Sequence, residues 1–182
     1  GDLDYLRMHS PGAVTDAMAA LCRGLLPGFS FVTTISTACS AAGNAIMYGA
    51  RLIEAGLADI VIAGGTDALC SFTLNGFNSL RILDSEICRP FDASRAGLNL
   101  GEGAGYLVLS AASEGAMCRL SGWGNANEAY HQTASTPEGT GPGLSMSSAI
   151  EKAGLTPSDI GFVNTHGTGT EINDLAESNA ML

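Results

Sequence analysis

Three short, almost wholly apolar runs constrain the fold of this 182-residue chain more than any other feature. They cover residues 59–65, 104–110 and 160–167, and a fourth run over 29–37 is rich in β-branched and aromatic residues. Each has the length of a β-strand rather than of a helix. Apolar residues at nearly every position predict strands covered on both faces, as in a parallel sheet.

Segments with apolar residues at helical spacing alternate with these runs. The expected helices are residues 12–25, a segment after Cys39 that carries Ile46, Ala50, Ile53 and Leu57, residues 143–155, and a helix opening at 174–182. Gly56 and Asp59 should end the second of these, and residues 156–159 should form a turn. The alternation predicts an α/β fold with a largely parallel or mixed sheet.

Composition excludes several classes of protein. Hydrophobic residues make up 46% of the chain and charged residues only 14%, which predicts one compact domain. The net charge is −10 and the basic residues are scattered, so neither nucleic acid nor an anionic membrane is an expected partner. The five cysteines lack metal-type CxxC spacing, which for all but one of them indicates buried thiols in a reducing cytoplasm.

The stretch "ISTACSAAGNAI", residues 35–46, places Cys39 at an abrupt strand-to-helix corner. The helix dipole and the N–H groups at a helix start favour negative charge, so this thiol should lose its proton more easily. The same N–H groups can hold an oxyanion, and the small neighbouring residues leave room for a substrate. On this local pattern a nucleophile and a packed structural cysteine are equally compatible.

His166 lies at the end of another apolar run, in the Gly- and Thr-rich loop "THGTGT". In open α/β sheets, sites form at strand ends, and a Cys with a His there indicates acyl transfer or thiol hydrolysis. The glycine clusters do not form a phosphate loop, because "GEGAG" precedes a strand and lacks the GxGxxG spacing.

The motifs of the chain resemble those of β-ketoacyl synthases, most closely the ketosynthase II-type condensing enzymes and their polyketide relatives. In order, the matching motifs are "TACSAAGNAI", "AGGTDA", "RPFDASRAGLNLGEGAGYLVL", "NEAYHQTASTPEG" and "VNTHGTGTEINDLAE". The resemblance implies a thiolase-like layered α/β/α/β/α fold, present only in part. Residues 1–182 would form a single partial ketosynthase domain, with 1–112 ending the N-terminal half and 113–182 starting the C-terminal half.

The resemblance also implies roles for individual residues. Cys39 matches the acylated nucleophile and His166 the first of two family histidines. The other matches are Thr168 and Thr170 for the phosphopantetheine arm, Phe77 for the acyl pocket, Arg81 for carrier-protein docking, and Asp174 and Glu177 as supporting residues. His131 matches a non-catalytic position, and His9 has no match.

The implied activity is decarboxylative Claisen condensation of an acyl-Cys thioester with malonyl-ACP, in fatty-acid or polyketide synthesis. The implied partners are acyl carrier protein and a second ketosynthase subunit, in a homodimer or heterodimer, in the cytoplasm. No cofactor is implied, because the substrates arrive on a phosphopantetheine arm. The family's lysine, second histidine and "GFGG" loop would lie beyond Leu182, so we expect an internal fragment that is inactive alone.

Other readings of the sequence remain open. A non-condensing partner subunit would usually lack Cys39, and a thiolase or ketosynthase III-type enzyme would differ around "HGTGT" and "RPFD". An α/β-hydrolase with a thiol nucleophile would need a Gly-x-Cys-x-Gly elbow, whereas "TACSA" lacks the first glycine. A structural fragment without activity of its own is the remaining alternative.

Overall fold

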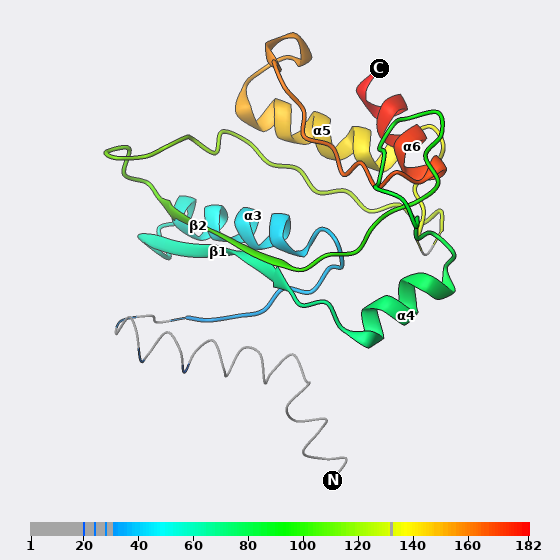
Figure 1. Ribbon diagram of the computed structural model, residues 1–182. Coiled ribbons are helices and arrows are strands. Elements are labelled where there is room, and N and C mark those ends of the chain that lie inside the picture. Colours follow the sequence, from blue (N-terminus) through cyan, green and yellow to red (C-terminus); the bar gives the residue numbers. More distant parts are fainter. Residues whose placement is uncertain (1–19, 21–23, 25–27, 29–30, 132) are drawn as a thin grey trace. The chain divides into compact units, whose positions relative to one another are not determined.

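The computed structural model describes residues 20, 24, 28, 31–131 and 133–182 of the chain (Figure 1). The elements in order are α3 (Ala41–Glu54), β1 (Ile60–Asp67), α4 (Ser71–Ser79), β2 (Gly103–Ser110), α5 (Thr140–Ala153), the 3₁₀ turn η1 (Pro157–Asp159) and α6 (Glu171–Met181). The mixture of helices and strands confirms the α/β expectation. The helix expected over 12–25 lies outside the described residues, apart from Ala20 and Gly24.

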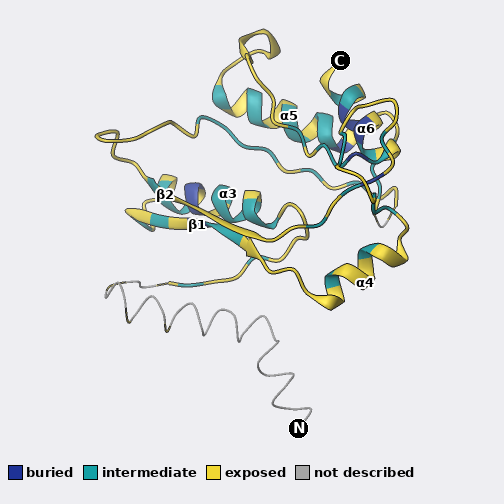
Figure 2. Ribbon diagram, viewed as in Figure 1, coloured by how far each residue is buried: buried dark blue, intermediate teal, exposed yellow. Residues whose placement is uncertain are grey.

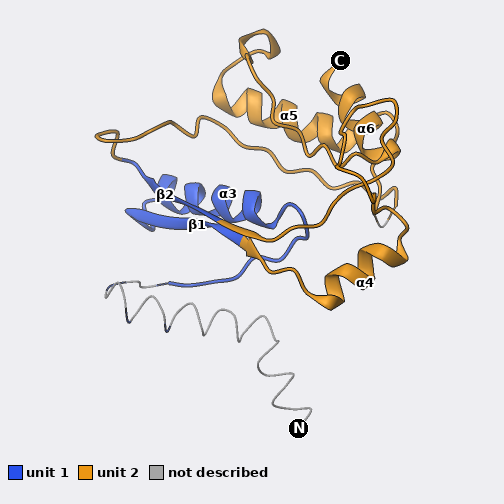
Figure 3. Cartoon of the chain, in the orientation of Figure 1, with its two compact units in different colours: residues 1–65, 105–111 blue, residues 66–104, 112–182 orange. Residues whose placement is uncertain are grey.

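The chain divides into two compact units, which are described separately (Figure 3). Unit 1 comprises residues 1–65 and 105–111, and unit 2 comprises residues 66–104 and 112–182. Each unit groups residues that contact one another, and each combines two separate stretches of the sequence. The division of the sequence into halves at residues 112 and 113 stays a prediction.

Strands β1 and β2 pair with each other, and they run antiparallel. A Cβ atom on Gly64 would lie 2.1 Å from the Gly105 carbonyl oxygen, and the Thr66 hydroxyl donates to the Gly103 carbonyl. Residue numbers thus rise along one strand as they fall along the other. The apolar run at 59–65 is therefore a strand, as expected, but its predicted parallel pairing was wrong. The predicted cover on both faces was also wrong, because Ile60 is 62% exposed and Ile62 is 41% exposed.

Two expected strands are absent from the described residues. Residues 31–36 have no regular secondary structure, and Thr37 forms only an isolated bridge with Cys39. Residues 160–167 are also without regular structure. Neither segment pairs with a strand in the described part of the chain. Those two predictions were wrong, since an apolar run becomes a strand only where a neighbour completes its hydrogen bonds.

Helix α3 packs on the sheet of unit 1 through small residues. Gly49 and Ala50 are buried, and a Cβ atom on Gly49 would lie 2.8 Å from Val61 and 3.2 Å from Leu109. The helix ends as expected near Gly56, which has φ 67°, while the Leu57 N–H donates to the Leu52 carbonyl. A firmly seated α3 fixes the direction of its N-terminus.

In unit 2, α5 packs against α6 at close range. Gly139 has φ 71°, and a Cβ atom on it would lie 2.2 Å from the Ala176 carbonyl oxygen. Glycine is needed here for both the backbone conformation and the approach of α6. Figure 2 shows buried residues gathered at α6 and the loops around it. This region is the core of unit 2.

Among the described residues, no helix combines the length and the apolar character needed to cross a bilayer.

Candidate active site

Cys39 stands at the turn that leads into α3, and it is exposed. The preceding residue, Ala38, has φ 53°, a left-handed conformation that costs energy for any residue with a side chain. Such strain concentrates at functional turns, where it aims a neighbouring side chain. The sequence predicted a strand-to-helix corner at Cys39. The helix follows as expected, but the residues before it form a strained turn and not the end of a strand.

Hydrogen bonds brace this turn from both sides. The Ser40 hydroxyl donates to the Thr37 carbonyl at 2.7 Å, and the Asn44 side-chain amide donates to the Thr37 hydroxyl at 2.8 Å. The Ala41 N–H donates to the Ala38 carbonyl at 3.0 Å. The residues next to Cys39 in the sequence are small, and the start of α3, the positive end of its dipole, follows two residues later. A thiol held there can attack a thioester carbonyl.

His166 lies in the loop before α6 and is exposed. Its backbone N–H donates to Glu177 Oε1 at 2.7 Å, and the N–H of Gly167 donates to Glu177 Oε2 at 2.8 Å. Glu177 is 7% exposed, so its carboxylate holds the two successive amides away from water. The loop therefore presents His166 from a fixed backbone.

Asp174 is the second buried carboxylate of α6, one turn before Glu177, and it is 1% exposed. Its oxygens accept hydrogen bonds from the N–H of Gly169 at 3.2 Å and of Phe91 at 2.7 Å. Arg95 Nε lies 3.3 Å from Asp174 Oδ2 as an ion pair without the alignment of a hydrogen bond. Both carboxylates thus bind backbone amides, and the supporting role expected for them stays a prediction.

Thr168 and Thr170 meet through their hydroxyl groups, 2.9 Å apart. Both are half-buried, and Thr170 is the N-cap residue of α6. The structure therefore brings together, within unit 2, His166, Thr168, Thr170, Asp174 and Glu177. Together they form a loop with hydroxyl and imidazole groups on a rigid base.

Phe77 lies in helix α4 of unit 2, and Arg81 lies just after it. The sequence did not predict this helix, because Asn75 and Gly76 interrupt its weak apolar pattern. Phe77 is half-buried. Arg81 follows the helix, is exposed, and has φ 55°.

The remaining sequence-predicted residues divide between the two units. Cys39 belongs to unit 1, whereas the other expected site residues all belong to unit 2. His131 is exposed, and its Nδ1 accepts a hydrogen bond from the Thr133 N–H at 3.2 Å. His9 lies outside the described residues.

The sequence did not predict that residues 88–95 contact the loop of His166 and the start of α6. Cys88 Sγ donates to the Thr168 carbonyl at 3.3 Å, and Phe91 and Arg95 both bind Asp174. The motif "RPFD" marked the segment, but a motif of side chains gives no sign that a backbone N–H is the group in contact.

Two family descriptions match the chain. Residues 17–115 match "Beta-ketoacyl synthase, N-terminal domain", and residues 117–182 match "Beta-ketoacyl synthase, C-terminal domain". The 3-oxoacyl-[acyl-carrier-protein] synthase 2 of Staphylococcus aureus is 38% identical over 157 residues, which make up 80% of this chain and 39% of that protein. The chain thus spans about two fifths of the length of this curated relative.

Solved structures agree with the sequence relatives. A ketosynthase (ApeO) in complex with its chain length factor (ApeC) from Xenorhabdus doucetiae has a TM-score of 0.82 and 40% identity, covering 91% of this chain and 41% of its own. The complex AntDE:AntF, a type II polyketide acyl-carrier protein with its ketosynthase, has a TM-score of 0.83 and 31% identity, covering 91% and 44%. The fold is part of a thiolase-like ketosynthase fold. With sequence, family descriptions and fold in agreement, the chain belongs to the β-ketoacyl synthase family.

Proposed function

We propose that residues 1–182 are part of a β-ketoacyl-[acyl-carrier-protein] synthase, an acyltransferase that lengthens an acyl chain by decarboxylative Claisen condensation. The observation that carries the proposal is Cys39, an exposed thiol on a braced, strained turn at the start of α3, in a chain of this family. A chain length factor, the partner of one similar ketosynthase, would serve a different role and would not need this thiol.

In the first stage, the Cys39 sulfur attacks the carbonyl carbon of an acyl thioester. A new sulfur–carbon bond forms, the bond to the phosphopantetheine sulfur breaks, and the released thiolate takes up a proton. The N-terminus of α3 stabilises both the attacking thiolate and the oxyanion of the tetrahedral intermediate. The bracing of the turn keeps the thiol in one orientation, which lowers the entropic cost of reaching the transition state.

In the second stage, a malonyl thioester loses carbon dioxide, and the electron pair of the broken carbon–carbon bond forms an enolate. The His166 imidazole donates a hydrogen bond to the thioester oxygen, where negative charge develops. The enolate carbon attacks the acyl-Cys39 carbonyl, and the Cys39 sulfur departs. The product is a 3-oxoacyl chain longer by two carbons.

The other residues of unit 2 would bind the substrates. We assign Thr168 and Thr170 to the phosphopantetheine arm, Phe77 to the acyl pocket and Arg81 to the acidic carrier protein. The paired hydroxyl groups of the two threonines and the exposure of Arg81 support these assignments. The proposed steps use no resident cofactor, because the thioester itself activates both substrates.

We also propose that the enzyme acts as a homodimer or a ketosynthase heterodimer in the cytoplasm. Similar ketosynthases have been solved with a chain length factor and with an acyl carrier protein, which supports both kinds of partner. Residues 1–112 would end the N-terminal half of the ketosynthase domain, and residues 113–182 would start its C-terminal half.

The test uses the intact enzyme, meaning a full-length β-ketoacyl synthase that carries residues 1–182. We expect it to convert acyl-ACP and malonyl-ACP into a 3-oxoacyl product two carbons longer, detected by mass spectrometry of the carrier protein. The variant Cys39→Ala should form no acyl-enzyme. The variant His166→Ala should still acylate Cys39 but should release carbon dioxide from malonyl-ACP about 100-fold more slowly or worse. Full condensation by Cys39→Ala would overturn the proposal.

A further inference from the structure

We propose that Arg95 is a positioning residue for His166, acting through Asp174 on the loop that carries the histidine. This inference rests on the proposed function of His166. Arg95 does not belong to that loop and was not among the residues expected at the site. The proposed role rests on the contacts that Arg95 makes with α6 and with its own segment, residues 88–97.

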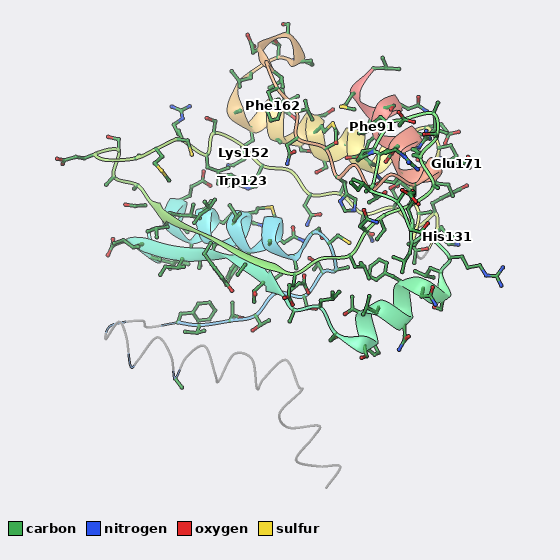
Figure 4. The ribbon with its side chains drawn as sticks, viewed as in Figure 1. Phe91, Trp123, His131, Lys152, Phe162 and Glu171 are labelled. Atoms are coloured by element: carbon green, nitrogen blue, oxygen red, sulfur yellow. The ribbon has the colours of Figure 1, made fainter. Side chains whose placement is uncertain are left out.

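Arg95 joins the 88–97 segment to the start of α6. One terminal nitrogen, Nη1, donates to the Asp92 carbonyl at 3.0 Å, and the other, Nη2, donates to the Glu171 carbonyl at 3.4 Å. Its Nε lies 3.3 Å from Asp174 Oδ2. Phe91 and Glu171, labelled in Figure 4, belong to the two segments that Arg95 connects.

Asp174 is where this connection reaches the histidine loop. Its Oδ2 faces Arg95 and accepts the Phe91 N–H, while its Oδ1 accepts the Gly169 N–H. A carboxylate that is 1% exposed needs a countercharge to keep these oxygens in place. Glu177 is also buried, and the Asn173 amide donates to both carboxylates. Loss of Arg95 would therefore leave the buried carboxylate of Asp174 without the cation that lies beside it.

Close packing transmits any shift of the segment to the loop. A Cβ atom on Gly169 would lie 2.6 Å from the Gly97 carbonyl oxygen and 2.8 Å from Cys88 Sγ. A Cβ atom on Gly167 would lie 3.3 Å from Pro90 Cβ. Phe91 has φ 64°, a conformation that persists only when its surroundings hold it. The hydrogen bond from the Phe91 N–H to the Asp174 carboxylate supplies that restraint.

The loop has two separate attachments to α6, and Arg95 contacts only the one made by Asp174. Glu177 holds the amides of His166 and Gly167, whereas Asp174 holds the amides of Gly169 and Phe91. In Arg95→Gln, the Gly169 and Phe91 amides should exchange with solvent faster, and the His166 and Gly167 amides should change less. Amide hydrogen exchange resolved by residue measures this difference.

The kinetic test uses the intact enzyme and separates the two stages of the reaction. Arg95→Gln should acylate Cys39 within about twofold of the parent rate and should release carbon dioxide from malonyl-ACP about tenfold more slowly or worse. Arg95→Lys retains the charge and should recover part of the loss. The matched control is Arg89→Gln, because Arg89 pairs with Asp84 at 3.2 Å in the same segment. It should leave the release of carbon dioxide within about twofold of the parent rate.

The outcomes separate this inference from the proposed function. If His166→Ala retains full release of carbon dioxide, the proposed function fails, and the inference fails with it. If His166→Ala is impaired but Arg95→Gln matches the parent in both rates, the inference alone is overturned. An equal loss in Arg89→Gln and Arg95→Gln would also overturn it, since the effect would then belong to the segment and not to Asp174. Uneven amide exchange with a selective loss of decarboxylation supports it.

Discussion

At the scale of single residues, the site depends on side chains that fix backbone and on a few that carry chemistry. Asp174 and Glu177 bind four backbone amides between them, and none of those contacts uses a side chain of the histidine loop. These contacts do not involve the imidazole of His166 or the hydroxyl groups of Thr168 and Thr170, which bond to each other. Buried carboxylates in this place stabilise the geometry of the loop.

Cys70 is an exposed thiol that a chemical label would modify in addition to Cys39, whereas the sequence indicated a buried thiol. It stands at the N-cap position of α4, and its Sγ lies 3.3 Å from the Thr73 hydroxyl. That hydrogen bond lowers the pKa of the Cys70 thiol below its ordinary value. We expect Thr73→Val to raise the pKa of Cys70 again and to slow its alkylation by iodoacetamide at neutral pH.

Cys118 provides the internal control for this prediction, because it is exposed in the same protein. Peptide mapping by mass spectrometry after short exposures, at several pH values, gives the rate for each thiol. An unchanged rate at Cys70 in the Thr73→Val protein, with Cys118 also unchanged, would contradict the role of the hydroxyl group.

The sequence could predict the site only where side chains act directly. Cys39 and His166 stood out because a thiol or an imidazole at the end of an apolar run already indicates chemistry. Asp174 and Glu177 entered through family resemblance alone, and Arg95 did not enter. Their contacts are to backbone groups of residues far away in the chain, and no local pattern reports such contacts.

At the scale of elements, the helices were predicted better than the strands. The expected helices after Cys39, over 143–155 and near the C-terminal residues were all confirmed, and the expected turn at 156–159 is η1. A helix satisfies its own hydrogen bonds, so a local pattern is nearly sufficient. The runs at 29–37 and 160–167 needed partner strands, which a local pattern cannot supply.

The β1–β2 pair allows a direct test of the sheet. A Cβ atom on Gly64 would lie 2.1 Å from the Gly105 carbonyl oxygen and 2.7 Å from Tyr106 Cα, both of them backbone atoms. We expect Gly64→Ala in the intact enzyme to lower the free energy of unfolding by about 2–3 kcal/mol, because the strands must separate to admit the methyl group.

Gly76→Ala is the matched control for that substitution. Gly76 lies inside α4, and a Cβ atom there would meet nothing within 4 Å. Alanine should raise the free energy of unfolding by roughly 0.5–1 kcal/mol. Denaturant titration of both variants measures the two changes. Equal effects of the two substitutions would mean that the β1–β2 contact is not as close as described.

Glu128 is the carboxylate that fixes the start of α5. Its oxygens accept hydrogen bonds from the Thr136 hydroxyl at 2.8 Å and from the Gly141 N–H at 2.8 Å. Burial, the largest single effect, acts to raise the pKa of Glu128, but hydrogen bonds from Thr136 and Gly141 together outweigh it. The pKa is therefore held below its ordinary value.

A lowered pKa in the folded state makes stability depend on pH in a definite direction. The contribution of Glu128 is fully present above the unfolded pKa of about 4.3, and it is lost as pH falls through the lower folded value. In Glu128→Gln, the free energy of unfolding should fall less steeply than in the parent below about pH 5. Glu138→Gln, at an exposed position nearby, is the control. Parallel curves for parent and Glu128→Gln would contradict the assignment.

At the scale of the whole molecule, much apolar surface is uncovered within the described residues. Phe72 is 88% exposed, Phe162 is 82% exposed, and Ile87 is 83% exposed. Exposed apolar side chains in such number are typical of surfaces that contact other protein. This agrees with a chain that spans about two fifths of a curated relative and with the subunit partners proposed for the enzyme.

The central claim is that Cys39 accepts the acyl group, and acyl transfer in the intact enzyme tests it most directly. The enzyme would be incubated with acyl carrier protein that carries a radiolabelled acyl chain, without malonyl-ACP, beside its Cys39→Ala variant. The account predicts label on the parent protein, in the peptide that contains Cys39, and none on the variant. Label of equal amount on the variant, or no label on a well-folded parent, would contradict it.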